Sequence, residues 1–249
     1  MRKFTRLVFR LLCLVAKLAC AGWDYAWLAW RYGGSLPLGE RALWLHRASQ
    51  SVLRLLIPRI ETEGPSPRTG LLVSNHLSYL DILVFAAIAP AVFVSKSEIK
   101  HWPVFGWFAR MAGTIFVRRA RRTEVGRIGD EIRDVLRQEQ LVVLFPEGTT
   151  SNGQQILPFR SSLLEPVCDS TCQLTAAYVE YAVTDGTATD DVCYWDDMTF
   201  FRHLLRLMTK QQVNVRVRFA PAVRNASNRK DLARQLHAEV VRLKTSPAG

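Results

Sequence analysis

The stretch Ser74-Asn75-His76-Leu77-Ser78-Tyr79-Leu80-Asp81 indicates the fold class most clearly, because it joins a strand pattern to a helix pattern. Residues 71–73 precede it as a short apolar run that is typical of a buried strand. Residues 82–88 follow it as an apolar run of helical character. Polar residues at such a junction lie at the rim of a sheet, where active-site side chains are held. The stretch therefore predicts an α/β protein with a functional site at this strand end.

His76 and Asp81 are separated by five positions within this junction. If the helix begins near Ser78, Asp81 lies in its first turn and can reach back to His76. The carboxylate then accepts the proton of one ring nitrogen and leaves the other nitrogen free as a base. The alternative is a polar cap followed by a helix that happens to contain an aspartate. The residue types alone do not separate these two interpretations.

Composition limits the class of protein and the kind of partner. The 249 residues are 49% hydrophobic and 22% charged, which excludes disorder and fits one domain with an added terminal element. The net charge of +11 predicts an anionic partner: nucleic acid, a membrane surface or an acidic substrate. No residues have the spacing of metal ligands, so we expect no metal site. The five cysteines predict reduced, buried thiols in a cytosol-facing protein: Cys13, Cys20, Cys168, Cys172 and Cys193.

The N-terminal segment is apolar from residue 7 to residue 30, but charges interrupt it at regular intervals. At about 100° per residue the charges share a sector of roughly 80°. This charged seam comprises Lys3, Arg6, Arg10, Lys17, Asp24 and Arg31. A helix across a bilayer would leave Lys17 near its centre, whereas a helix in the interface keeps the seam among the headgroups.

We therefore expect an interfacial helix, or a pair of helices broken near Gly22. Trp23, Trp27 and Trp30 suit the headgroup boundary, and the basic residues suit anionic lipid. A secretory signal peptide is the alternative. The charge of Lys17 within the apolar run and the lack of a cleavage site oppose it.

The rest of the chain alternates between strand and helix patterns. Strands are predicted at residues 60–63, 91–95, 141–145, 174–183 and 213–219. Helices are predicted at residues 39–57, 104–111, 123–140 and 231–243, with a further helix beginning at 158–162.

Two more strand ends carry polar residues. Residues 113–119 form a glycine turn and a strand that ends in arginines, which suit phosphate or carboxylate. A solvated basic loop is the alternative there. The strand at 141–145 runs into a loop of small residues with a single carboxylate, Glu147. We expect the Glu147 and His76 loops to share one crevice.

Three separated blocks resemble motifs of the glycerophospholipid acyltransferase family. Asn75-His76 with Asp81 resembles its His-x4-Asp block, residues 113–119 its Gly-x-x-Phe-x-x-Arg block, and residues 145–149 its Glu-Gly-Thr block. The resemblance covers residues 71–183. It implies a mixed, largely parallel sheet flanked by helices, with an anchoring element at 1–38 and an acyltransferase domain at 39–249.

The resemblance also implies residue roles. His76 is the general base and Asp81 orients it. The anionic head of the acceptor is held by Arg119, Glu147, Gly148 and Thr149. Supporting positions are Asn75, Gly113, Phe116 and Arg118, and the anchor residues are Arg6, Arg10, Lys17, Trp23, Trp27 and Trp30.

The implied reaction moves a fatty acyl group from an acyl thioester to the hydroxyl of a lyso-lipid, foremost lysophosphatidic acid. The thioester is acyl-coenzyme A or acyl carrier protein as co-substrate, and no bound cofactor is needed. The implied location is the inner membrane, with the catalytic domain facing the cytoplasm on an anionic lipid surface. No nucleic acid is expected as a partner.

Two departures from the family pattern leave the acceptor open. Thr150 stands where the family commonly has arginine, and residues 174–178 lack the proline of its fourth block. Residues 159–163 and 194–198 resemble the subgroup of lyso-ornithine lipid acyltransferases. The alternatives of other classes are a membrane-attached hydrolase, a nucleic-acid-binding protein and a structural membrane scaffold.

Overall fold

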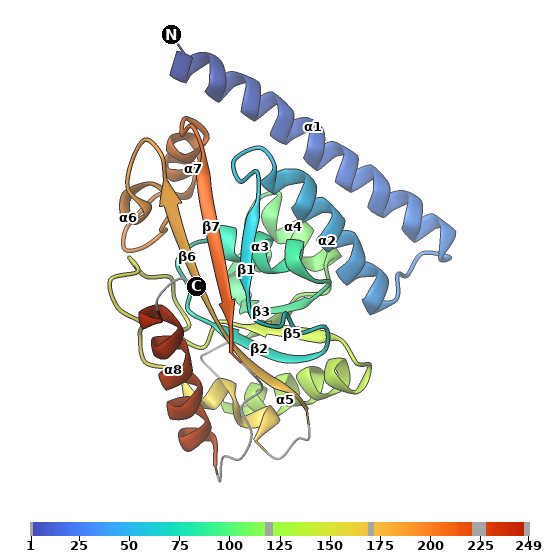
Figure 1. The fold of residues 1–249 in the computed structure, drawn as a ribbon. Helices are drawn as coiled ribbons and strands as arrows, with labels where there is room; N and C mark the ends of the chain where they lie inside the picture. The colour runs from blue at the N-terminus through green and yellow to red at the C-terminus, as the bar shows by residue number, and fades with distance from the viewer. Residues whose placement is uncertain (1, 118–121, 169–171, 221–227, 247–249) are drawn as a thin grey trace.

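The computed structural model describes residues 2–117, 122–168, 172–220 and 228–246. Its centre is a seven-stranded sheet in the order β1-β7-β6-β2-β5-β3-β4, with helices on both faces (Figure 1). All neighbouring strands are parallel except β6 and β7, which are antiparallel. The predicted mixed, largely parallel sheet is confirmed.

The strands agree with the apolar runs of the sequence. The central strands β2 and β5 are buried along their whole length, as expected for strands covered on both faces. The strands are β1 (Ile60–Glu63), β2 (Gly70–Ser74), β3 (Val92–Lys96), β4 (Ile115–Val117), β5 (Leu141–Leu144), β6 (Leu174–Val183) and β7 (Val213–Phe219).

The long helices also follow the predicted pattern. They are α1 (Arg2–Arg31), α2 (Leu38–Leu53), α3 (Leu80–Ile88), α4 (Phe105–Met111), α5 (Arg122–Arg137) and α8 (Arg229–Thr245). The helix predicted from residue 158 is wrong: two short 3₁₀ turns, Ser161–Leu163 and Glu165–Val167, stand there. Pro166 in the second turn cannot donate a backbone hydrogen bond, which limits helix growth. The helices α6 (Ala188–Asp191) and α7 (Phe200–Met208) were not predicted.

The core has two layers, one on each face of the sheet. Side chains of α1, α2, α3 and α7 fill one face, among them Trp44, Val84 and Leu207. Side chains of α5 and α8 fill the other, among them Ile132 and Leu236. The sheet is thereby fixed between helices, and its strand ends hold the loops that follow β2 and β5.

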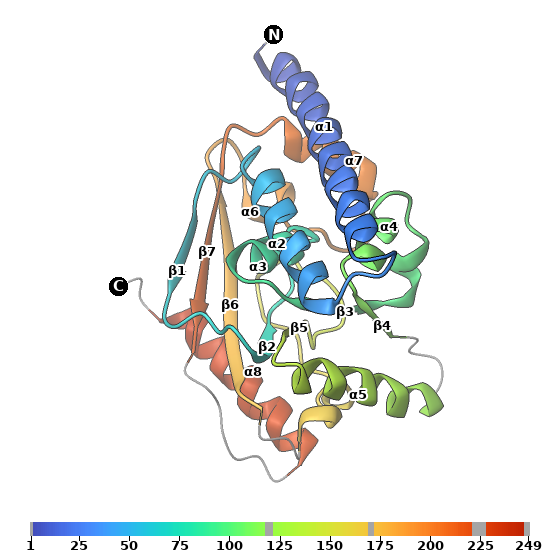
Figure 2. The ribbon, with the colours of Figure 1, turned by 90° about the vertical axis from the view of Figure 1, so that its right-hand side faces the viewer.

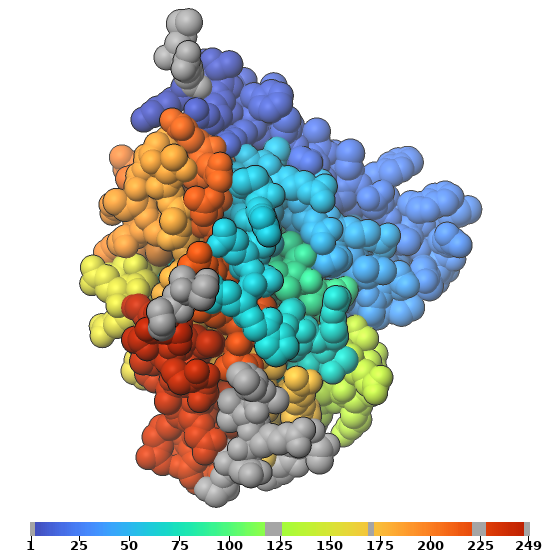
Figure 3. Space-filling model, in the orientation of Figure 1, coloured from blue at the N-terminus to red at the C-terminus, as the bar shows by residue number. Residues whose placement is uncertain are grey.

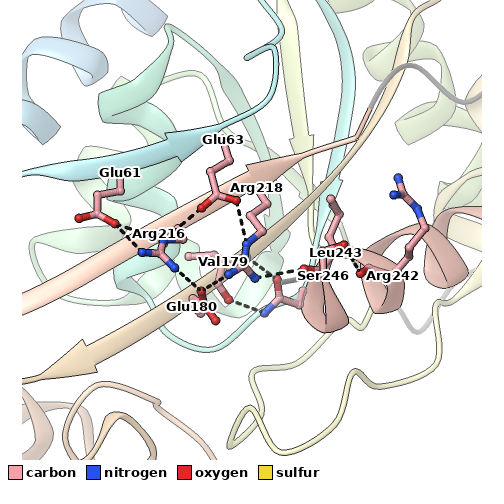
Figure 4. A network of polar contacts seen from close by, with 10 residues as sticks. Glu61, Glu63, Val179, Glu180, Arg216, Arg218, Arg242, Leu243 and Ser246 are labelled. Atoms are coloured by element: carbon pink, nitrogen blue, oxygen red, sulfur yellow. Dashed lines mark hydrogen bonds and ion pairs between the residues drawn. The ribbon is translucent and has the colours of Figure 1, made fainter. Parts of the chain in front are cut away.

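Charged residues tie together three strands at one end of the sheet order (Figure 4). Arg216 and Arg218 of β7 form ion pairs with Glu61 and Glu63 of β1 and with Glu180 of β6. Buried Arg218 also donates to the carbonyl oxygen of Leu243 at the end of α8 (3.1 Å). These two arginines are therefore neutralised within the fold and add little to an anion-binding surface.

The cysteines form no disulfide within the described residues, in agreement with the predicted reduced state, but they are not uniformly buried. Cys193 is buried as predicted, whereas the burial prediction is wrong for the others: Cys20 is exposed on α1, and Cys13, Cys168 and Cys172 are partly exposed. Cys20 lies on the same outward side of α1 as Trp23 and Trp27, so its thiol faces away from the core.

Helix α1 is continuous from Arg2 to Arg31, so the structure has the single helix of the two expected forms and not the pair broken near Gly22. A β-carbon at Gly22 would meet no atom within 4 Å, and the helix passes this residue without a packing constraint. Figures 1 and 3 show α1 on the outside of the molecule, against α2 and α7. Within the described residues, no helix combines the length and apolar character needed to cross a membrane.

Part of the charged seam of α1 faces inward, which differs from the expectation that it meets lipid headgroups. Arg6 donates to the carbonyl oxygen of Thr209 (2.8 Å). Arg10 donates to the carbonyl oxygens of Met208, Lys210 and Gln211. Lys17 donates to Ser51 Oγ (2.9 Å). The arginines satisfy free carbonyls at the end of α7, where a cation also suits the helix dipole.

The opposite side of α1 is apolar and exposed. Trp23 and Trp30 expose 77% and 73% of their surface, and Trp27 exposes 53%. The same side presents Phe4, Val8, Phe9, Leu12 and Val15. Large apolar side chains are seldom exposed along a whole helix face unless another apolar phase covers them.

Candidate active site

The junction after β2 brings His76 and Asp81 together as predicted. Helix α3 begins at Leu80, so Asp81 stands in its first turn, and its side chain is fully buried. Asp81 Oδ2 accepts hydrogen bonds from the backbone N–H groups of Leu77 (2.7 Å) and Ser78 (2.9 Å). The same oxygen lies 2.8 Å from His76 Nδ1. The aspartate therefore shapes the loop and orients the imidazole at once.

The tautomer of His76 follows from this contact. An ionised carboxylate can only accept, so Nδ1 carries the proton and Nε2 keeps its lone pair. The described residues offer Nε2 no hydrogen-bond partner. The imidazole stacks on Phe145 with ring centroids 4.0 Å apart, and 16% of the side chain is exposed. The His76 imidazole is thus fixed in orientation and partly accessible.

Glu147 connects the loop after β5 to the His76 loop. Strands β2 and β5 are parallel neighbours, so their carboxyl ends meet at one edge, as predicted. Glu147 Oε1 accepts from the backbone N–H of His76 (3.0 Å), and Oε2 accepts from that of Leu157 (3.3 Å). Burial raises the pKa of Glu147 to about 8, although these backbone hydrogen bonds oppose the shift.

The geometry of Glu147 differs from that of a headgroup ligand. Its carboxyl group is buried, and both oxygens are engaged by backbone amides. Gly148 has a φ of 73°, which glycine adopts without strain, and its N–H closes a turn on the carbonyl oxygen of Phe145. Thr149 is exposed and Thr150 is partly exposed.

Asn75 joins the site to β6. Its side-chain amide donates to the carbonyl oxygen of Val179 (2.9 Å), and its side-chain oxygen accepts from the N–H of the same residue (2.8 Å). Two residues further along β6, Tyr181 Oη donates to Asp81 Oδ1 (2.7 Å). The sequence did not single out Tyr181, because an inward-facing tyrosine in a strand usually serves only as core.

An aromatic wall that the sequence did not predict stands beside the dyad. Tyr79 Oη shares a hydrogen bond with His203 Nδ1 of α7 (3.0 Å). Tyr79 also meets Phe200 and Tyr194 edge to face. The backbone N–H of Tyr194 donates to the carbonyl oxygen of Leu77 (2.7 Å). Helix α7 and the segment before it therefore hold the outer side of the His76 loop.

The predicted arginine cluster is not placed. Arg118, Arg119 and Arg121 lie outside the described residues, and nothing is described of the Arg122 side chain. Gly113 has a φ of 80°, and a β-carbon there would meet the side chain of Leu38 at 2.7 Å. Phe116 lies on the edge strand β4, opposite Ser95 of β3.

A buried carboxylate beside an oriented imidazole is an arrangement suited to accepting a proton from a hydroxyl group or water. The family model for Acyltransferase matches residues 59–179, which include all the placed site residues except Tyr194, Phe200, His203 and Tyr181.

The relatives agree with this class. The chain is 34% identical to the lyso-ornithine lipid O-acyltransferase of Rhodobacter capsulatus over 84% of this chain and 78% of the relative. It is also 34% identical to the 1-acyl-sn-glycerol-3-phosphate acyltransferase of Neisseria meningitidis serogroup B, over 68% of each chain. It belongs to the Acyltransferase family, and it is an acyltransferase.

The fold has a counterpart among solved structures. The crystal structure of the 1-acyl-sn-glycerophosphate acyltransferase from Thermotoga maritima matches with a TM-score of 0.66 over the full length of both chains. The two sequences are 18% identical, so this match concerns the fold.

Proposed function

We propose that the protein transfers a fatty acyl group from an acyl thioester to the free hydroxyl of a lyso-lipid, with His76 as the general base. The observation that carries this proposal is the 2.8 Å contact between His76 Nδ1 and Asp81 Oδ2, which leaves Nε2 free. The relatives support this substrate class, because the names of the two relatives given above describe acyl transfer to a lysolipid.

The proposed step needs no covalent enzyme intermediate. His76 Nε2 takes the hydroxyl proton as the acceptor oxygen attacks the carbonyl carbon of the thioester. The carbon–sulfur bond then breaks, and the imidazolium returns the proton to the departing thiolate. Asp81 fixes the tautomer and stabilises the imidazolium while it holds the extra proton. The carrier of the donor is coenzyme A or acyl carrier protein.

The neighbouring residues divide into two proposed roles. Asn75 and Glu147 position the His76 loop, because their side-chain polar atoms bond to backbone groups. The anionic head of the acceptor is held by Thr149, the backbone at Gly148 and the arginines 118 and 119. Gly113 and Phe116 lead the chain to those arginines. The role proposed for Glu147 is therefore support of the His76 loop, in place of the headgroup contact expected from the sequence.

We further propose that residues 1–38 hold the domain of residues 39–249 on an anionic membrane. The exposed apolar side of α1 supports this, together with Lys3 and Arg31, which are exposed at its two ends. Figure 2 shows α4 and α7 on the same side of the sheet as α1. Val104, Trp107 and Phe201 expose apolar surface there, and Lys100 and Arg110 line a hollow of about 390 Å³ beside them.

This arrangement extends the anchor beyond the N-terminal helix. Tryptophan and basic side chains together suit the headgroup region of an anionic leaflet. The leaflet proposed is the cytoplasmic face of the inner membrane, where an acyl thioester is available. A lyso-lipid then reaches His76 from the surface on which the protein lies.

Lysophosphatidic acid is the proposed acceptor, and lyso-ornithine lipid is the second candidate. The second is favoured by Thr150, which replaces an arginine suited to phosphate, and by the wider coverage of the Rhodobacter capsulatus relative. The test is an acyl-transfer assay with both lysolipids against both thioester donors. Acylation of only the phosphate-free lysolipid would replace the first candidate, and release of free fatty acid without acylated product would indicate a hydrolase.

A further inference from the structure

Tyr181 is buried beside Asp81, and the proposed reaction does not yet give it a role. It lies on β6, within the core layer that faces α2 and α3. Its hydroxyl donates to Asp81 Oδ1 at 2.7 Å. Burial and the neighbouring Asp81 carboxylate raise the pKa of Tyr181 well above its ordinary value. The hydroxyl therefore stays protonated and remains a donor over the working pH range.

The contact completes the coordination of a buried carboxylate. Asp81 Oδ2 already accepts from His76 Nδ1 and from two backbone N–H groups. Tyr181 is the donor that engages the other oxygen. A carboxylate held at both oxygens cannot rotate, so the oxygen that faces His76 stays in the plane needed for its hydrogen bond.

The hydroxyl also affects the charge that His76 experiences. The O–H dipole points its positive end at Asp81, which partly offsets the carboxylate charge within a buried site. Asp81 is faced by His76 from its own loop, by Tyr181 from β6, by Glu147 from the loop after β5 and by Cys193 from the end of α6. Tyr181 is the one of these that donates to Oδ1.

We propose that Tyr181 is a positioning residue of the acyl transfer, which acts on His76 through Asp81. It keeps the carboxylate in place and limits its pull on the His76 proton. This inference rests on the proposed role of His76.

Tyr181→Phe tests the proposal, because it removes only the hydroxyl. Tyr178→Phe is the matched control: it makes the same change on the same strand, but its ring belongs to the core layer on the opposite face of the sheet. For each variant, kcat and KM for both substrates are measured from pH 5 to pH 10, together with Tm.

For Tyr181→Phe we expect kcat to fall by about tenfold, in the range of a lost hydrogen bond to a charged group. KM for both substrates should stay within about twofold, since the residue does not touch them. The acid limb of the kcat/KM profile should move to higher pH, because the carboxylate is no longer offset. Tyr178→Phe should match the wild type in kcat and in the profile.

Replacement of Tyr181 by a fluorinated tyrosine keeps the ring and the hydroxyl donor. It therefore tests the effect of the Tyr181–Asp81 hydrogen bond on the pH profile even if Tyr181→Phe does not fold. A more acidic phenol is a stronger donor, and the acid limb should then move to lower pH. A wild-type kcat and profile in Tyr181→Phe would overturn the proposal. A lower kcat and Tm with an unmoved acid limb would overturn it as well, because the role would then be structural.

A parallel His76→Ala assay separates this inference from the proposed function. If His76→Ala is active, the proposed base is wrong and both fail. If His76→Ala is inactive while Tyr181→Phe equals the wild type, only the role of Tyr181 fails.

Discussion

The β2–α3 junction and helix α1 satisfy their polar groups in the same way, yet they present opposite surfaces. At the junction, Asp81 is buried and engaged at both oxygens, and His76 remains the partly accessible polar group. On α1, Arg6 and Arg10 turn inward to the carbonyls of α7, and an apolar side remains exposed. Inward polar contacts thus leave a partly accessible imidazole at the junction and an exposed apolar side on α1, which are the regions proposed to act in acyl transfer and in lipid contact.

The two regions meet through α7. Its last carbonyls receive the arginines of α1, and His203 in its middle bonds to Tyr79 beside the dyad. Substitutions at the junction should therefore change turnover and leave membrane binding intact. Substitutions on the outer side of α1 should do the reverse.

Among substitutions around His76, a large effect is expected for Asp81→Asn. An amide cannot accept all the hydrogen bonds that the carboxylate accepts, and it does not stabilise an imidazolium. Acyl transfer should fall by at least about a hundredfold, as for loss of general-base catalysis. Binding to anionic vesicles should be unchanged. Asp134→Asn on the exposed part of α5 is the control, and equal losses in both variants would contradict the assigned role.

The outer side of α1 is tested by replacing Trp23, Trp27 and Trp30 with serine. Less apolar surface then enters the interface, and the affinity for phosphatidylglycerol vesicles should fall by about tenfold or more. Turnover of short-chain substrates in solution should stay near the wild-type value. Sedimentation with vesicles measures the binding, with Val241→Ser on α8 as the exposed apolar control. Unchanged binding of the triple variant would place the membrane contact elsewhere.

Glu147 links the stability of the site to pH. Its pKa in the folded protein is about 8, above the ordinary 4.5, so between these values the folded state holds a proton that the unfolded state releases. Rising pH therefore lowers the free energy of unfolding in this window, by up to about 1.4 kcal/mol per pH unit.

Urea denaturation at pH 5, 6, 7 and 8 measures this slope. Glu147→Gln has no titrating group, so its free energy of unfolding should vary less with pH than that of the wild type. Identical slopes for the two proteins would show that Glu147 does not hold a proton in this range.

A smaller effect is expected for Arg10→Ala. The carbonyls at the end of α7 lose a donor, at a cost of about 1 kcal/mol for a partly exposed contact. Tm should fall by about 2–4 °C for a chain of this length. Arg31→Ala at the exposed end of the same helix is the control. If Tm falls by the same amount in both variants, the hydrogen bonds of Arg10 to α7 do not contribute to stability beyond the effect of removing a charge from α1.

The sequence predicted the parts of the site that depend on local spacing. His76 and Asp81 meet because the loop between β2 and α3 is short: Asp81, in the first turn of α3, accepts from the backbone N–H groups of Leu77 and Ser78 and lies within reach of the imidazole. The loops at His76 and Glu147 meet because parallel strands end at the same edge. The apolar run 141–145 was sufficient to identify β5, one of the two fully buried central strands.

Contacts between distant segments could not be predicted in this way. Tyr181 lies 100 residues from Asp81 and reaches it only after β6 pairs with β2. The inward direction of Arg6 and Arg10 depends on the free carbonyls of α7, a helix that the sequence pattern did not reveal. The charged residues of α1 have the same spacing whether they bind lipid headgroups or backbone carbonyls, so the sequence pattern does not tell which of the two they bind.

His76 is proposed as the base of an acyl transfer at a membrane surface. Acyl transfer and vesicle binding, measured on the same preparation of purified His76→Ala, separate the chemical role of His76 from folding and membrane contact. We expect transfer from thioester to lyso-lipid to fall by about a thousandfold, while vesicle binding and Tm stay at wild-type values. Near-normal transfer by the folded, membrane-bound variant would contradict it.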